Sequence, residues 1–171
     1  SGFYDKIDKI LIYYKSAITM NFSNSEIFNL FKSNKRLLLF LFEEKIIYMD
    51  DIITSKMLKD KYYYAKYPQY FSPEIKPFLS ENLIDIIDQE LPEDFYEKRK
   101  IGENDDIICQ MIKNDKKDDF IIFRNKSNFP LEMEIEQSIY ETNNFIINKY
   151  PTLIEYAAFC GSIDIFQYLI F

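Results

Sequence analysis

Apolar residues recur along the chain with the three- and four-residue spacing that places side chains on one face of an α-helix. The chain has only 3 Gly and 6 Pro, too few for the many tight turns of a β-sandwich or barrel. The pattern therefore predicts an all-α fold. Its helices are expected over residues 3–20, 23–31, 35–49, 80–90 and 92–100. A further short helix, capped by Asp50 or Asp51, is expected to run to Leu58, and another is expected to start at Pro73 with Ser72 as its cap.

Two of these helices carry clear end signals. Ser23 with Glu26 three residues later fits a capping box. Gly102 follows the last of the helices, as a C-terminal glycine commonly does. We place a boundary at this glycine, between a helical bundle-like N-terminal region, residues 1–102, and a second region, residues 103–171.

The second region contains a weak internal repeat. Residues 108–120 align with residues 154–166, an offset of 154 − 108 = 46 residues, and Phe120 falls on Phe166. Each copy reads as two short helices with a polar turn between them. Such a unit cannot bury its apolar face without a neighbour, so the two copies are expected to stack.

The second copy has the features of a compact helix pair. Thr152 can cap the first helix through its hydroxyl. Ala157 and Ala158 are small and let neighbouring pairs approach closely, and Gly161 permits the left-handed turn that folds the second helix back on the first. Through these residues the segment 152–170 resembles the helix pair of the ankyrin repeat.

The resemblance has two departures. Leu153 and Glu155 stand where the ankyrin pattern has Pro and His. The offset of 46 residues exceeds the usual repeat of about 33, so residues 124–150 are interpreted as an insertion, and residues 138–147 are predicted to add a helix there. The second region is similar to the divergent ankyrin-like domains of unknown function that are abundant in some protists. It is predicted to be the start of an α-solenoid, truncated at the C-terminus.

Resemblance to ankyrin repeats implies a non-catalytic adaptor or scaffold that binds a protein partner through the concave face of the helix pairs. In typical repeats, positions between the small residues and the turn glycine point to that face. Phe159 has a second interpretation, in which its ring packs against the helix of the insertion. The positions carried over to this chain are Lys113, Asn114, Tyr156, Phe159 and Cys160.

A second functional hypothesis is structural self-assembly. Two helix pairs rarely suffice for an independent stack, so the N-terminal helices are expected to cover one face of it. The other face, around Tyr168, Leu169 and Phe171, is expected to be open. Exposed apolar patches tend to find partners, so this face is expected to make homotypic contacts, as in a homodimer, where no further repeat covers it.

Charge disfavours nucleic acid as a partner. The net charge is −7, and residues 81–171 carry 9 basic against 19 acidic residues, a net of −10. Residues 1–80 carry 12 against 9, a net of +3. An acidic second half repels phosphate backbones. The aromatic stretch 62–71 leaves two interpretations open: bases could stack on its rings, or the rings form a packing layer between helices.

The chain offers little for catalysis. It has no His, the commonest general base and metal ligand, and two cysteines, Cys109 and Cys160, each expected in a helix as a partly buried thiol. Three glycines can hardly build a phosphate-binding loop. Adjacent carboxylates such as Asp105 and Asp106 are usually solvated. We therefore predict no enzymatic activity, no metal site and no cofactor.

Nothing in the pattern indicates secretion or a membrane span. The first ten residues mix charged and apolar side chains, and the apolar run 37–42 is far too short to cross a bilayer. Two cysteines cannot form a disulfide framework. The chain is predicted to be soluble and cytoplasmic, in a reducing environment. Its opening Ser1-Gly2 resembles a tag remnant, which suggests a piece of a longer protein.

Overall fold

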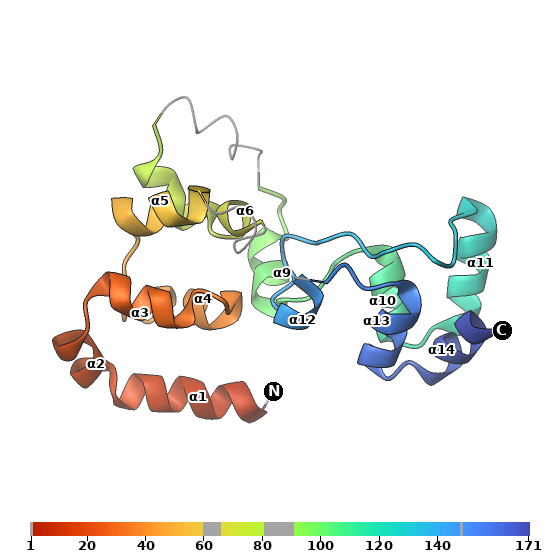
Figure 1. Cartoon of the computed structure of the whole chain (residues 1–171), viewed down its shortest axis with the longest axis horizontal. Helices are drawn as coiled ribbons and strands as arrows, with labels where there is room; N and C mark the ends of the chain where they lie inside the picture. The colour runs from red at the N-terminus through yellow and green to blue at the C-terminus, as the bar shows by residue number, and fades with distance from the viewer. Residues whose placement is uncertain (1, 60–65, 81–90, 148) are drawn as a thin grey trace. The chain divides into compact units, whose positions relative to one another are not determined.

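A computed structural model of the chain describes residues 2–59, 66–80, 91–147 and 149–171 (Figure 1). These residues form helices joined by turns and loops, and they contain no strand beyond one isolated bridge between Glu134 and Thr152. The predicted all-α class is confirmed for the described residues. The chain divides into two compact units, residues 1–93 and residues 94–171.

Unit 1 is a succession of short helices. The helix predicted over residues 3–20 is divided at Tyr14 into two. The predicted capping box is confirmed, because the Ser23 backbone N–H donates to the Glu26 carboxylate (2.8 Å) and the Ser23 hydroxyl accepts from the Glu26 backbone N–H. The described elements are α1 (Gly2–Tyr13), α2 (Lys15–Asn21), α3 (Asn24–Phe31), α4 (Lys35–Glu43), α5 (Asp51–Lys59), α6 (Tyr67–Tyr70), α7 (Ser72–Ile75) and the 3-10 helix η1 (Lys76–Phe78).

The helix predicted over residues 35–49 ends early, at Glu43. Lys45 takes a left-handed backbone conformation (φ 54°), which turns the chain away from the helix axis. Ile46 and Ile47 then donate their backbone N–H groups to the carbonyl of Leu41 and are buried. These two apolar residues therefore reach the core from a turn, although their spacing continues that of the helix.

Part of the aromatic stretch 62–71 lies in the core of unit 1. Tyr67, Tyr70 and Phe71 are fully buried. The buried ammonium of Lys35 lies 5.3 Å from the centre of the Tyr67 ring and 5.2 Å from that of Tyr70, within the range of cation–π attraction. For these rings the packing interpretation is confirmed. Residues 62–65 of the stretch lie outside the described residues. The same holds for residues 81–90 of the helix predicted over residues 80–90.

Unit 2 begins before Gly102, so the boundary predicted at that glycine lies inside the unit. Phe95 is buried with its ring 5.8 Å from that of Tyr140, and Thr142 donates both its backbone N–H (3.1 Å) and its hydroxyl (2.8 Å) to the Gly102 carbonyl. These contacts tie the first helix of the unit to a later loop. The helices are α9 (Phe95–Ile101), α10 (Ile107–Lys113), α11 (Lys117–Ser127), α12 (Asn144–Ile147), α13 (Leu153–Cys160) and α14 (Ile163–Ile170).

Four of these helices form two helical hairpins, the first of α10 and α11 and the second of α13 and α14. Asp106 caps α10 and Thr152 caps α13 through their side chains. The two turns are left-handed, at Asp115 (φ 49°) and Gly161 (φ 73°). Both pairs of positions are 46 residues apart, so the alignment of the two copies extends to caps and turns. Helix α10 packs beside α13, and α11 beside α14 (Figure 1).

Most of the insertion is a loop. Helix α12 covers only the last four residues of the helix predicted over residues 138–147. The reason is that polar groups of the loop bond to the start of the first hairpin. The Asn104 side-chain amide donates to the Glu136 carbonyl (3.0 Å), and the Ser138 hydroxyl donates to the Asp105 carboxylate (2.8 Å). The loop is therefore fastened to the hairpin by specific hydrogen bonds.

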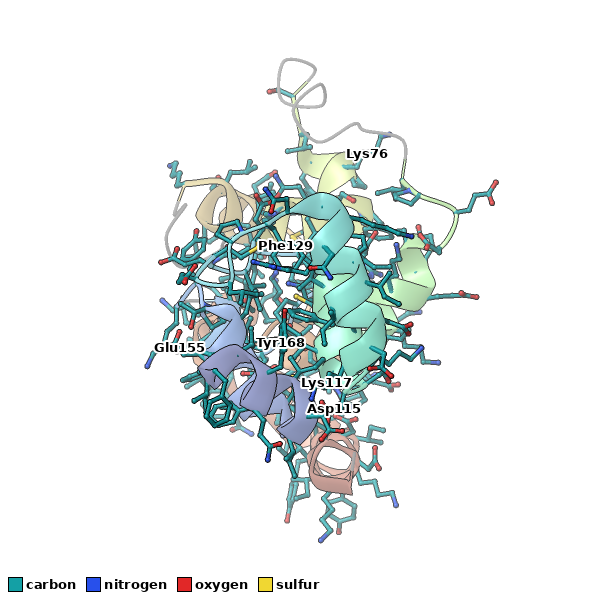
Figure 2. The ribbon with its side chains drawn as sticks, turned by 90° about the vertical axis from the view of Figure 1, so that its right-hand side faces the viewer. Lys76, Asp115, Lys117, Phe129, Glu155 and Tyr168 are labelled. Atoms are coloured by element: carbon teal, nitrogen blue, oxygen red, sulfur yellow. The ribbon has the colours of Figure 1, made fainter. Side chains whose placement is uncertain are left out.

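One carboxylate joins the two hairpins. The first backbone N–H groups of a helix have no acceptor within the helix. In α14, those of Asp164 and Ile165 donate to the Asp115 carboxylate at 3.1 and 3.0 Å. Beside them, the Ser162 hydroxyl donates to the carbonyl of Ile112. Figure 2 shows Asp115 just before the start of α11, next to α14. The turn of one hairpin thus caps a helix of the other.

Replacing Gly102 by Ala is expected to destabilise the protein more than replacing Gly161. A left-handed backbone costs an L-residue about 1–2 kcal/mol at either position. A Cβ at Gly102 would also come within 2.9 Å of Thr142 Oγ1 and displace its hydrogen bond, whereas nothing lies within 4 Å of a Cβ at Gly161. Gly102→Ala is therefore expected to lower the free energy of unfolding by about 1 kcal/mol more than Gly161→Ala does. Urea unfolding measures the free energy of unfolding of both variants. Equal losses of stability would contradict the close packing of Gly102 against Thr142.

Asp115→Ala is expected to lower the free energy of unfolding by about 1–2 kcal/mol, because two N–H groups of α14 lose their acceptor. Asp119→Ala is the matched control, since Asp119 is an exposed residue in the first turn of α11. Its effect should stay within about 0.5 kcal/mol. Urea unfolding and hydrogen exchange at the Asp164 and Ile165 amides measure the loss. A variant no less stable than the control would rule out the cap.

Candidate functional site

The residues predicted to bind a partner come from equivalent positions of the two hairpins. Lys113 and Phe159 are 46 residues apart, as are Asn114 and Cys160. Because α10 packs beside α13, equivalent positions of these helices lie on the same side of the two-hairpin stack. The fold therefore brings the two halves of the predicted site together.

Phe159 is both packed and accessible. Its ring stacks on that of Phe145 in α12, with ring centres 5.5 Å apart and planes 9° apart. Phe159 nevertheless remains 46% exposed and Phe145 44%. The ammonium of Lys149 lies 4.9 Å from the centre of the Phe145 ring. Phe159 thus contacts the insertion helix and also presents an apolar surface to solvent. Phe145 belongs to the site, although the sequence did not single it out.

The polar half of the site is formed by α10 and the residues before it. Lys113 is exposed and forms an ion pair with Glu103. The Asn114 side-chain amide donates to the carbonyl of Gln110 (2.7 Å), which fixes its orientation at the end of the helix. The ion pair and the amide are therefore held in place beside the apolar rings by local contacts.

Tyr156 is a core residue. It is 4% exposed and packs with both hairpins, so its ring is not available to a partner. Cys109 is buried and Cys160 half-buried. Of the five predicted residues, Lys113, Asn114 and Phe159 are exposed and Cys160 is partly so.

Burial sets the chemistry of both thiols. It raises the pKa of the Cys109 thiol well above its ordinary value, and the negative charges of Asp106 and Glu141 raise it further. Burial also raises the pKa of Cys160, although Tyr156 and Lys113 act in the opposite direction. A raised pKa lowers the fraction of the reactive thiolate at neutral pH.

The adjacent carboxylates of Asp105 and Asp106 act as an ion-pair partner and as a helix cap. Asp106 accepts the backbone N–H of Ile108 (2.7 Å) at the start of α10. Asp105 lies 3.1 Å from the ammonium of Lys98. Burial alone would raise the pKa of Asp105, but hydrogen bonds from Ser138 and Lys98 bring it below its usual value. In the ranges that the structure describes, no three His, Cys, Asp or Glu side chains converge to hold a metal ion.

The end face of the second hairpin differs from the prediction. Tyr168 and Leu169 are only partly exposed and pack against the core between the hairpins, with the Tyr168 ring 6.1 Å from that of Phe120. Figure 2 shows Tyr168 between α14 and α11. Phe171 is fully exposed. The reason is that positions 168 and 169 share the side of α14 that carries buried Ile165. The apolar residues that α14 leaves open are Ile163 and Ile170.

A groove of about 620 Å³ lies on unit 1, between α3 and α5. Lys56 is partly engaged there, because its ammonium donates to the Ser25 hydroxyl (2.7 Å). The groove offers positive charge and hydroxyl groups at an open surface. Its lining residues are Asn29, Lys32, Asp51, Ile52, Ser55, Lys56 and Lys59.

Comparison of the chain with protein-family models, with curated proteins and with solved structures finds no match. Within the described residues, every helix is too short or too polar to cross a membrane.

Alkylation should distinguish the two thiols. Cys160 is expected to react with iodoacetamide at pH 8 several-fold more slowly than a free cysteine peptide, whose pKa is about 8.5, because its raised pKa reduces the thiolate fraction. Cys109 should react only after unfolding, since it is buried. Mass spectrometry of timed samples measures both rates. Reaction of Cys160 faster than the free peptide would show an activated thiol and contradict this description.

Proposed function

We propose that the chain is a non-catalytic protein-interaction module, an adaptor or scaffold, and that unit 2 consists of ankyrin-type helix pairs. A protein partner binds the surface formed by Lys113, Asn114, Phe159 and Cys160, with Phe145 added from α12. The observation that carries the proposal is the placement of equivalent positions of two adjacent hairpins on one accessible surface.

The chemistry of this surface suits a protein partner. Protein interfaces combine an apolar, often aromatic centre with a polar rim, and a few residues supply most of the binding energy. Here the stacked rings of Phe159 and Phe145 form the centre. The ion pair of Lys113 with Glu103 lies on the neighbouring helix and its preceding turn. The rings are already stacked, so binding need not order them first, which favours affinity.

The same features support a non-catalytic role. The buried thiols have raised pKa values, and the carboxylates of Asp105 and Asp106 are engaged in an ion pair and a helix cap. These groups stabilise unit 2, which leaves the surface around Phe159 as its exposed and chemically distinctive part.

The Phe159→Ala/Lys113→Ala double variant is expected to lose partner capture. Truncating two central interface residues typically weakens binding by about 2–4 kcal/mol, or at least about 30-fold in Kd. The experiment is an affinity pull-down from lysate of the source cell, with captured proteins identified by mass spectrometry and their affinity for the purified chain then measured by calorimetry.

The matched control is Ile101→Ala/Lys100→Ala, which also truncates one exposed apolar and one exposed lysine side chain of unit 2, but on α9. It should capture the same protein as the wild type. A partner retained equally by both double variants would place the binding surface elsewhere and refute the proposal.

A further inference from the structure

The first hairpin carries an open apolar groove of about 360 Å³ between α10 and α11. Ile107 and Ile122 stand on its two sides and are 57% and 54% exposed. Exposed apolar patches of this kind mark surfaces that a partner can cover. The groove is lined by Ile107, Gln110, Met111, Asn114, Lys116, Asp119, Ile122, Phe123 and Lys126.

The groove lies on the side of the first hairpin opposite the second hairpin. Successive residues of an α-helix are about 100° apart around its axis. On α10, Ile107, Met111 and Asn114 therefore share one side, and Cys109 and Ile112 lie on the other. Cys109 and Ile112 are buried in the core between the hairpins, where the Ile112 carbonyl accepts from Ser162.

The register of the repeat shows what kind of surface fits this groove. Of the nine groove-lining residues, eight have an equivalent 46 positions later in the second hairpin or its turn, and Lys126 has none because position 172 lies beyond the 171 residues. Seven of these equivalents belong to the core between the hairpins, and the eighth, Ser162, is buried and bonds to Ile112. Six of the nine groove-lining positions are exposed in the first hairpin, whereas Met111 is buried and Gln110 and Phe123 are half-buried at the groove. The seven equivalents in the second hairpin are Leu153, Tyr156, Ala157, Cys160, Ile165, Tyr168 and Leu169, all buried or partly buried in the common core.

The complementary surface is also present in the same chain. Ile112 and Phe120 of the first hairpin face the second hairpin, and the equivalent residues of the second hairpin are Ala158 and Phe166. Ala158 is exposed and Phe166 half-buried, and Ile170 beside them is 53% exposed. We call the surface of Ala158, Phe166 and Ile170 the outer face of the second hairpin. Its positions 158 and 166 are equivalent to those of the first hairpin that pack against the second hairpin within one chain.

Charge favours the same pairing. Residues 107–127 of the first hairpin carry five basic and three acidic residues, a net of +2. Residues 153–170 of the second hairpin carry Glu155 and Asp164 and no basic residue, a net of −2. Opposite charges steer and orient association. Two copies of the same hairpin, which carry charge of the same sign, would repel each other.

We propose that the α10–α11 groove binds a second copy of this chain, which inserts the outer face of its second hairpin. The two copies then continue the stack of hairpins from one chain to the next. The contact is heterologous, so it joins different faces and adds further copies head to tail. The groove shares Asn114 with the partner-binding surface but includes neither Phe159 nor Lys113, so variants at those two residues test the partner binding separately.

This contact is weaker than the contact between hairpins within one chain. Within the chain, the Asp115 carboxylate caps α14 of the adjacent hairpin. The equivalent turn residue in the second hairpin is Gly161, which has no side chain to cap a helix of the next copy. The association is therefore expected to be reversible and to depend on protein concentration.

Analytical ultracentrifugation of the full chain and of two variants tests the proposal. The wild type is expected to shift to larger species as its concentration rises. Ile122→Glu blocks the groove and Ile170→Glu blocks the outer face, so each variant alone should stay monomeric. An equimolar mixture should form a 1:1 dimer, because one variant keeps its groove and the other keeps its outer face. Ile101→Glu, at an exposed site on α9, is the control and should associate like the wild type.

A wild type that remains monomeric over the whole concentration range would overturn the proposal. So would an Ile122→Glu variant that self-associates like the wild type, which would indicate contact between two identical outer faces, or a mixture that stays monomeric. Both substituted side chains are exposed, and circular dichroism checks that the variants fold. If either glutamate variant loses helix, Ile122→Ser and Ile170→Ser replace the pair in the same mixing experiment.

Discussion

The packing of the two hairpins depends on polar groups that neither hairpin can satisfy alone. The start of α14 has backbone N–H groups without an acceptor in their own helix, and the Asp115 carboxylate of the other hairpin accepts two of them. The Ser162 hydroxyl adds a buried hydrogen bond to the Ile112 carbonyl. These directional bonds fix how the hairpins sit against each other, whereas the apolar core between them supplies non-directional attraction.

The register of the two hairpins also determines which side chains are exposed together on the surface of unit 2. With α10 beside α13, Lys113 and Phe159 come from equivalent positions and share one side of unit 2. The fastened insertion loop then leads to α12, whose Phe145 ring stacks on Phe159. The same register leaves one groove open on the first hairpin and one apolar face open on the second. The two proposals of partner binding and of head-to-tail association therefore rest on a single geometric fact.

Local signals could be predicted from the sequence, and contacts between distant segments could not. The cap at Thr152 and the left-handed turn at Gly161 depend on residue type and near neighbours, and both are confirmed. The early end of α4 depends on a left-handed Lys45, a conformation that lysine rarely adopts and that no pattern signals. The stacking of Phe145 on Phe159 and the burial of Tyr156 arise only once α12, α10 and α13 are packed together.

Nuclear Overhauser contacts measured on the full chain test whether the two hairpins pack with a register of 46 residues. Contacts are expected between the aromatic protons of Phe120 and Tyr168, whose ring centres are 6.1 Å apart, and between Ile112 and Ser162. Finding both would establish the register from which both surfaces follow. Absence of both, with each hairpin still helical, would mean that the hairpins do not pack in this way and would remove the basis of both proposals.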